Sequence, residues 1–309
     1  MSADRVSESS KPAIGFVGVG NMGWPMAACL VGAGYQVAVA DARRATADNF
    51  VQQVGGAAPQ TLSELAGGAR VVVTMLPTSA IVEQVLAGDG DTLLAGLQPG
   101  TVVIDMTSGL PAVTQALAAK VAERGAVLID APVSGGVSRA KTGQLAIMVG
   151  GDAEVIERVR PVLASMGSTI TRCGGVGAGQ AMKALNNLVS AGGFLIGIEA
   201  LLIGQRFGLE PGLMVDVLNA STGMNNSTQK KFRQFVLSRA FDSGFSLDLL
   251  VKDLSIALQM AKDTATPVPF AAVCRDMVAG ALGMLGPGQD HTALARLSER
   301  LAGTELKEG

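Results

Sequence analysis

The chain has 309 residues, 48% of them apolar, and a formal net charge of −2. This length exceeds the usual size of a single hydrophobic core, so we expect two domains in a soluble globular protein. No basic run stands out, which argues against a surface for nucleic acid or another polyanion.

The few cysteines and the single histidine exclude several kinds of site. Cys29, Cys173 and Cys274 are far apart and form no CxxC pair, so neither a zinc site nor a disulfide framework is expected. This cysteine usage favours a reducing cytoplasm. His291 stands alone, so we predict no metal site and no histidine acid.

Two stretches bear on targeting. Residues 1–11 are polar and lack the apolar core of a signal peptide, which predicts a disordered tail. The most apolar stretch, residues 188–204, is interrupted by Glu199, whereas a membrane span needs roughly 20 uninterrupted apolar residues. We therefore expect a buried helix here and no membrane partner.

Short apolar, β-branched runs alternate with helical patterns through the first half of the chain. Such runs are typical of strands buried on both faces, and their alternation with helices predicts parallel βαβ units. The runs are residues 13–17, 36–39, 71–75, 101–105, 126–130 and 145–149.

The pattern changes at the glycines in positions 174, 175 and 177, beyond which it is helical with no convincing strand. We predict an α/β fold with a Rossmann-type, doubly wound sheet for dinucleotide binding at residues 12–176. An all-helical domain for substrate binding and oligomerisation follows at residues 177–309. The long helix between the domains should run about 30 residues, to Gly208.

A glycine motif follows the first predicted strand: Gly18-Val19-Gly20-Asn21-Met22-Gly23. Alone, G-x-G-x-x-G is a weak signal, but here it lies between a strand and a predicted helix at residues 22–33. Gly18 permits the tight turn, Gly20 lets the backbone approach a pyrophosphate, and Gly23 lets helix and strand pack closely. Unpaired N–H groups around Asn21 and Met22 would then face the phosphates.

Asp41 ends the second predicted strand, where a carboxylate accepts hydrogen bonds from a ribose 2′-OH and repels a 2′-phosphate. We therefore favour NAD as cofactor. An aspartate that merely caps the next helix is the alternative, and Arg43 or Arg44 could instead meet the 2′-phosphate of NADP. Leu76, Pro77 and Ser108 follow the third and fourth predicted strands, whose carboxyl ends should line the cofactor.

Three further positions suit a small acid substrate. Ser134, Gly135 and Gly136 expose consecutive backbone N–H groups that suit a carboxylate, although a glycine-rich turn without a ligand fits equally well.

Lys183 and Asn187 lie at i and i+4, so they share a helix face. Lys183 can be the general acid or base if burial lowers its pKa, and Asn187 would hold the substrate hydroxyl or fix the ammonium by hydrogen bonding. The alternative is an ordinary surface lysine. Lys252 would reach the substrate or cofactor, although the adjacent pair Lys252-Asp253 is more typical of a solvated surface.

These segments together resemble the β-hydroxyacid dehydrogenases, the family that includes 3-hydroxyisobutyrate dehydrogenase and tartronate semialdehyde reductase. The matching segments span nearly the whole chain and are residues 15–23, 75–77, 130–137, 177–187 and 252–253. The resemblance implies an NAD(P)-dependent oxidoreductase with catalysis by Lys183 beside Asn187. It further implies that Ser134, Gly135 and Gly136 bind the substrate carboxylate.

The resemblance also implies that Leu76, Pro77 and Ser108 line the cofactor and that Lys252 completes the site. It implies a homodimer or homotetramer, in which the long helix packs against another subunit.

One segment departs from the family. Asn225 and Asn226 stand where the mammalian-type enzymes are more aromatic, which suggests a polar pocket with Phe232 and Phe245 as walls. We expect a substrate with an additional hydroxyl or amine, such as glycerate, threonate or serine. Two other functions stay open: an imine reductase of the same fold, and a catalytically silent binding protein. Both tend to lose the lysine that this chain keeps.

Overall fold

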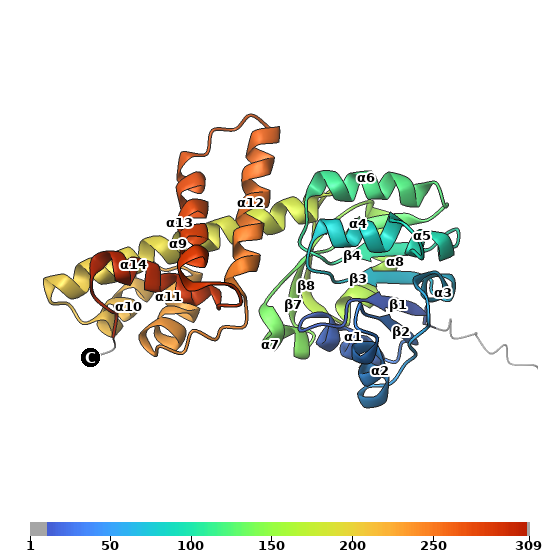
Figure 1. Ribbon diagram of the computed structural model, residues 1–309, viewed down its shortest axis with the longest axis horizontal. Coiled ribbons are helices and arrows are strands. Elements are labelled where there is room, and N and C mark those ends of the chain that lie inside the picture. The colour runs from blue at the N-terminus through green and yellow to red at the C-terminus, as the bar shows by residue number, and fades with distance from the viewer. Residues whose placement is uncertain (1–10, 308–309) are drawn as a thin grey trace, which may run out of the picture. The chain divides into compact units, whose positions relative to one another are not determined.

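The computed structural model describes residues 11–307 and divides into two units, the first ending at Gln180 and the second beginning at Ala181 (Figure 1). The predicted tail at residues 1–11 lies outside the described residues except for Lys11. The Lys11 ammonium donates to the carbonyl oxygen of Ala33 and lies 5.0 Å from the centre of the Tyr35 ring.

The first unit is a mixed sheet covered by helices. Its strands are β1 Ile14–Val17, β2 Val37–Ala40, β3 Val71–Thr74, β4 Val102–Asp105, β5 Val127–Asp130, β6 Val133–Ser134, β7 Leu145–Gly150 and β8 Gly167–Gly174. Its helices are α1 Gly23–Gly32, α2 Arg44–Gln53, α3 Leu62–Gly67, α4 Ser79–Ala87, α5 Leu93–Gly96, α6 Pro111–Ala122, α7 Gly136–Lys141 and α8 Ala153–Ala164.

The strand order is β2-β1-β3-β4-β5-β7-β6, with β8 paired to β7. Strands β1 to β5 are parallel, as predicted. Strand β7 is parallel to β8, but the prediction of parallel pairing is wrong for its other two neighbours, because β7 runs antiparallel to β5 and β6. A parallel pair needs a crossover of about a dozen residues or more, and the short α7 between β6 and β7 leaves no room for one.

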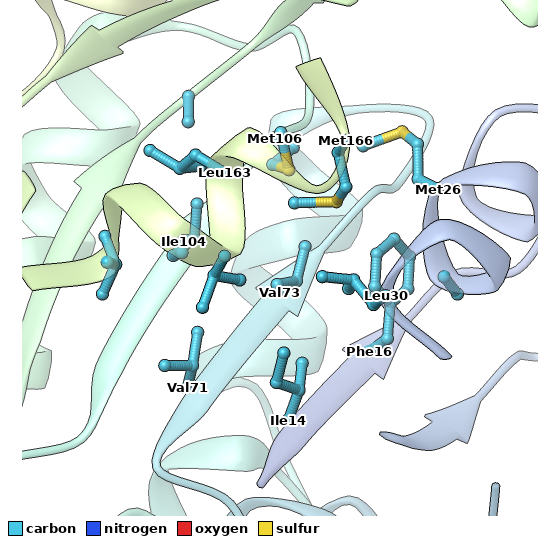
Figure 2. Packing of buried hydrophobic residues seen from close by; sticks show 14 of the residues in the cluster. Ile14, Phe16, Met26, Leu30, Val71, Val73, Ile104, Met106, Leu163 and Met166 are labelled. Atoms are coloured by element: carbon cyan, nitrogen blue, oxygen red, sulfur yellow. The ribbon is translucent and has the colours of Figure 1, made fainter. Parts of the chain in front are cut away.

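Alternate residues of each central strand enter two different cores. Ile14, Phe16, Val71 and Val73 pack with α1 and α8 on one face, as Figure 2 shows for Met26, Leu30 and Leu163. Val17, Val72, Val103 and Leu128 pack against α3, α4, α5 and α6 on the other face. Burial on both faces explains the continuous apolar runs of these strands.

The second unit is helical and has its own core, which includes Phe194, Phe232 and Leu254. Its helices are α9 Ala178–Phe207, α10 Pro211–Asn219, α11 Asn226–Lys230, the π-helix η1 Phe232–Leu237, α12 Leu247–Asp263, α13 Pro269–Leu285, the 3-10 helix η2 His291–Leu294 and α14 Ala295–Ala302. Helix α9 starts inside the first unit and has 30 residues, which confirms the predicted long helix.

Helix α9 carries a stripe of exposed apolar side chains. Val189, Ile196 and Ile203 recur every seven residues and are exposed by 75%, 56% and 71%. Among the described helices, α9 alone has the length and apolar composition that a membrane crossing requires, and half of its most apolar window is buried.

Candidate active site

The three glycines after β1 do different things. Gly18 has φ +96°, and a Cβ there would collide with the carbonyl oxygen of Met75. A Cβ on Gly23 would collide with the carbonyl oxygen of Gly18, so helix α1 starts directly against the turn. A Cβ on Gly20 would meet no protein atom within 4 Å. The fold itself therefore requires Gly18 and Gly23, whereas the space over Gly20 is open for a ligand.

The start of α1 suits a phosphate. Met22 is the N-cap residue and makes no side-chain capping bond, and its neighbour Asn21 is exposed. Pro25 has no N–H, and the N–H of Trp24 donates to the carbonyl oxygen of Gly20, so the N–H groups that the described chain leaves without an acceptor here are those of Asn21, Met22 and Gly23. They fit the pyrophosphate of a dinucleotide, which a helix N-terminus stabilises.

Asp41 follows β2 directly, as predicted, and holds the glycine loop. Its Oδ2 accepts a 3.1 Å hydrogen bond from the N–H of Val19, and its Oδ1 accepts one of 3.0 Å from the N–H of Arg43. Helix α2 has Arg43 as its N-cap residue and no side-chain cap, so the alternative of a capping aspartate is wrong.

The two arginines beside Asp41 differ. Arg44 is held by Asp48, at 2.8 Å, and by the carbonyl oxygens of Ala58 and Pro59. The Arg43 side chain is exposed and makes no hydrogen bond or ion pair within residues 11–307.

The loops after β3 and β4 lie beside the glycine loop. Strands β1, β3 and β4 are neighbours in register, so their carboxyl ends share one edge of the sheet. The N–H of Leu76 donates to Thr107 Oγ1 at 3.0 Å, and the Leu76 side chain lies against Gly18. Pro77 and Ser108 belong to the same two loops. The structure thus gathers the predicted cofactor residues of the first unit at one edge of the sheet, whereas Lys252, also predicted to bind the cofactor, belongs to α12 of the second unit.

A buried carboxylate that our sequence analysis missed supports these loops. Asp105 Oδ1 accepts hydrogen bonds from Thr74 Oγ1 at 2.8 Å and from the N–H of Thr107 at 3.1 Å. Its Oδ2 accepts from Gln180 Nε2 at 3.3 Å. Burial raises the pKa of Asp105 to about 6, against the lowering effect of these bonds.

A second buried carboxylate, Asp130, holds the start of α9. Its oxygens accept from the N–H groups of Gly177 at 2.7 Å and Gln180 at 2.8 Å. Burial raises its pKa, again against its hydrogen bonds. Gln180 then joins both carboxylates, because its side chain bonds Asp105, the carbonyl oxygen of Thr107 and the N–H of Gly109. The sequence signal that could have indicated this pair is an aspartate at the end of each of two predicted neighbouring strands, which the structure places in register.

The predicted carboxylate loop has an unusual backbone. Ser134 ends β6, and Gly135 and Gly136 follow with φ of +135° and +68°. Only glycine adopts such conformations without strain. A Cβ on Gly136 would meet no atom within 4 Å, whereas one on Gly135 would collide with the Arg139 side chain, so the backbone is open at Gly136.

In the second unit, Lys183, Asn187 and Lys252 gather around Asp253. Asn187 Nδ2 donates to Asp253 Oδ2 at 2.6 Å, and Lys252 Nζ lies 3.3 Å from Oδ1. Asp253 is 1% exposed and Lys183 is 9% exposed. The alternative of a surface lysine is therefore wrong, as is the solvated surface pair. Our sequence analysis assigned no role to Asp253, which anchors the group.

Burial lowers the pKa of Lys183. Asp253 opposes this by stabilising the ammonium, and Lys252 adds to it by repulsion. A lysine with a lowered pKa exchanges its proton near neutral pH far more readily than a solvated one. This arrangement can therefore take up and release a proton.

The predicted polar pocket is partly wrong. Phe232 is fully buried against Phe194, so it belongs to the core and forms no pocket wall. Asn225 caps α11, with its Oδ1 accepting from the N–H groups of Ser227 and Thr228. Phe245 is half-buried, with its ring 5.4 Å from that of His291.

Comparison with known proteins decides the family. Residues 13–175 match the model of the NAD binding domain of 6-phosphogluconate dehydrogenase, and residues 177–298 match that of the NAD-binding domain of NADP-dependent 3-hydroxyisobutyrate dehydrogenase. The chain belongs to the 3-hydroxyisobutyrate dehydrogenase family. As a β-hydroxyacid dehydrogenase, it is an NAD(P)-dependent oxidoreductase, and the silent alternative is wrong.

Individual relatives of this dehydrogenase agree. It is 36% identical to 2-(hydroxymethyl)glutarate dehydrogenase from Eubacterium barkeri, over 96% of this chain and 98% of that protein. The structure of Mycobacterium tuberculosis 3-hydroxyisobutyrate dehydrogenase with L-serine matches with a TM-score of 0.84 and 33% identity, over 92% and 98% of the two chains. An imine reductase from Myxococcus stipitatus matches with a TM-score of 0.63 and 18% identity, over 93% and 99%, which shows a shared fold only.

Proposed function

We propose that this dehydrogenase interconverts a small β-hydroxy acid and its carbonyl product, with Lys183 as the general acid and base. The observation that carries this proposal is the burial of Lys183 beside the bonded pair Asn187 and Asp253. No other lysine within residues 11–307 combines such burial with a lowered pKa and an anchored amide neighbour.

The proton path follows from these contacts. In oxidation, neutral Lys183 accepts the proton of the substrate hydroxyl while a hydride leaves the carbon that bears this hydroxyl. The nicotinamide of the bound dinucleotide supplies the hydride acceptor. In reduction, protonated Lys183 returns the proton to the carbonyl oxygen. Asp253 fixes the side-chain amide of Asn187. This amide forms a hydrogen bond with the same substrate oxygen and thereby orients the substrate.

The remaining site residues hold the two ligands. The N–H groups around Ser134, Gly135 and Gly136 bind the substrate carboxylate, and Lys252 adds a positive charge. The dinucleotide is held by the glycine loop with Asn21 and Met22, by Asp41, and by the loops of Leu76, Pro77 and Ser108. Lys252 also contributes to binding of the cofactor.

We infer that NAD is preferred over NADP, because the Asp41 carboxylate stands at the end of β2 and repels a 2′-phosphate. The exposed guanidinium of Arg43 opposes this preference. The ratio of kcat/KM with NAD to that with NADP tests it. Asp41→Ala should lower the ratio, whereas a wild-type preference for NADP would contradict the inference.

Several substrates are consistent with the relatives. Their names point to 2-(hydroxymethyl)glutarate and 3-hydroxyisobutyrate, and one structure contains L-serine. The two asparagines at 225 and 226 add glycerate and threonate as polar candidates. These five acids form the assay panel. If 3-hydroxyisobutyrate turned over far faster than serine, glycerate and threonate, the polar-pocket hypothesis would be wrong.

We also propose a homodimer or homotetramer in which the exposed stripe of α9 meets a second copy of the chain, because exposed apolar area of this kind is stabilised by burial. A cytoplasmic location stays a prediction that cell fractionation can test.

Substitution of Lys183 tests the mechanism. Lys183→Ala should lower kcat on every acid of the panel by at least about 10²-fold while leaving cofactor affinity and the melting temperature nearly unchanged. Lys262→Ala is the matched control, because this lysine is exposed at the end of α12. Wild-type turnover in Lys183→Ala would refute the assignment.

A further inference from the structure

A second ammonium lies on the helix face of the candidate catalytic lysine. Lys183, Asn187 and Ser190 occupy positions i, i+4 and i+7 of α9, so they share a face. Lys231 Nζ donates to Ser190 Oγ at 3.1 Å and lies 5.8 Å from the centre of the Phe194 ring. Ser190 is about 10 Å along the axis from Lys183.

Lys231 is a half-buried cation, and no carboxylate in the described part of the chain forms an ion pair with it. Within residues 11–307 its only hydrogen-bond acceptor is Ser190 Oγ, although an ammonium has three donors. Burial lowers its pKa to about 8, and Asp290 partly opposes this effect. Buried charges are normally paired, so Lys231 keeps the capacity to bind an anion.

The groups that face Lys231 do not supply that anion. His291 is neutral at physiological pH, because burial and Lys231 lower its pKa to about 4. Asp290 is committed to other donors, and no ion pair joins it to Lys231 in the described chain. Its oxygens accept from the N–H groups of Gly244, Phe245 and Thr292 and from the hydroxyls of Ser243 and Thr292.

We propose that Lys231 binds a second anionic group of the substrate, a carboxylate carried on a short chain beyond the hydroxyl-bearing carbon. The preferred substrates are then β-hydroxy acids with two carboxylates. This inference rests on the proposed function, because Lys183 marks where the hydroxyl is held. A charge-assisted hydrogen bond beside the Phe194 ring is stronger than one in water. The site therefore favours substrates that carry the second carboxylate.

Steady-state kinetics test the specificity. The wild type should have a higher kcat/KM for 2-(hydroxymethyl)glutarate, the dianionic acid of the panel, than for 3-hydroxyisobutyrate. Lys231→Met should lower kcat/KM for the dianion by roughly 10- to 100-fold, mainly through KM, and leave the monoanion within about 2-fold. Lys230→Met is the matched control, because the neighbouring Lys230 is exposed and the charge change is the same. Equal losses on both acids, or a wild-type preference for the monoanion, would overturn the proposal.

Binding of glutarate, followed by calorimetry, is a readout that needs no turnover. The affinity of the wild type for glutarate should exceed its affinity for butyrate. It should fall as pH rises through about 8, where Lys231 loses its proton. Lys231→Arg should keep the affinity at pH 9, because the guanidinium stays charged. If no acid is turned over but glutarate binding still depends on Lys231, only the proposed function fails. Glutarate binding that ignores Lys231→Met refutes the anion site.

Discussion

Asn187 donates a 2.6 Å hydrogen bond to Asp253, a carboxylate 66 residues further along the chain and almost fully buried. The same carboxylate lies 3.3 Å from Lys252 and stabilises the ammonium of Lys183. One anion among two cations and an amide thus orients Asn187 and opposes the burial that lowers the pKa of Lys183.

Substitutions at Asp253 and Lys252 should move the pH profile in opposite directions. Asp253→Asn removes the anion that raises the pKa of Lys183, so the acid limb of kcat/KM for oxidation shifts to lower pH. Lys252→Gln removes a repelling cation, so the limb shifts to higher pH. Profiles measured between pH 5 and pH 10 check both signs. A shift in the same direction for both variants would contradict the electrostatic assignment.

The second glycine of the loop should matter for the cofactor and not for the fold. Gly20→Ala adds a methyl group that meets no protein atom, so the melting temperature should change little. Affinity for the dinucleotide should fall by roughly 10-fold or more, because the backbone no longer reaches the pyrophosphate. Gly32→Ala, at the end of α1, is equally open and serves as control. Unchanged affinity in Gly20→Ala would place the phosphates elsewhere.

Ionisation of Asp105 should lower the free energy of unfolding. Its folded-state pKa, about 6, is above the ordinary value of 3.8, so the folded state binds the proton more tightly. This contribution is present at low pH and is lost as pH rises through 6.

Asp105→Asn removes that titration but also weakens the bond from Gln180, so the variant is destabilised overall. The loss in unfolding free energy should be smaller at pH 8 than at pH 5 by about 1 kcal/mol. Urea unfolding at the two pH values measures the difference. A loss that grows with pH would show that Asp105 is stabilised as the anion.

The exposed stripe of α9 should control assembly. Ile203→Glu places a charge at a position exposed by 71% in the single chain, so it should leave the fold intact and shift the protein towards the monomer. Light scattering after size-exclusion chromatography measures the mass. Ile81→Glu, on α4 of the first unit, is the control. Identical masses for wild type and Ile203→Glu would exclude the stripe as the interface.

Local patterns were enough to predict the central sheet and the glycine loop. Strands β1 to β5 are buried on both faces, so each has a continuous apolar run. Gly18 and Gly23 are required by a positive φ and by close packing, which restrict the residue type at those positions. Strand β6 has two residues and β8 is half-exposed, so neither produces such a run.

The buried residues that hold the site residues in place could not be predicted, because their roles depend on contacts between residues far apart in the sequence. Asp253 meets Asn187 across 66 residues, and Gln180 meets Asp105 across 75. No spacing rule along the chain marks such partners. The error at Phe232 has another cause: the residue begins a π-helix, so helical periodicity does not indicate which way its side chain points.

That π-helix, Phe232–Leu237, directly follows Lys231, and each of its hydrogen bonds spans one residue more than a hydrogen bond of an α-helix. Loss of a single residue within it would restore α-helical bonding and rotate the preceding segment by about 100°. A one-residue deletion at this π-helix would therefore point Lys231 in another direction. We expect substrate range among the relatives to vary with length at this turn.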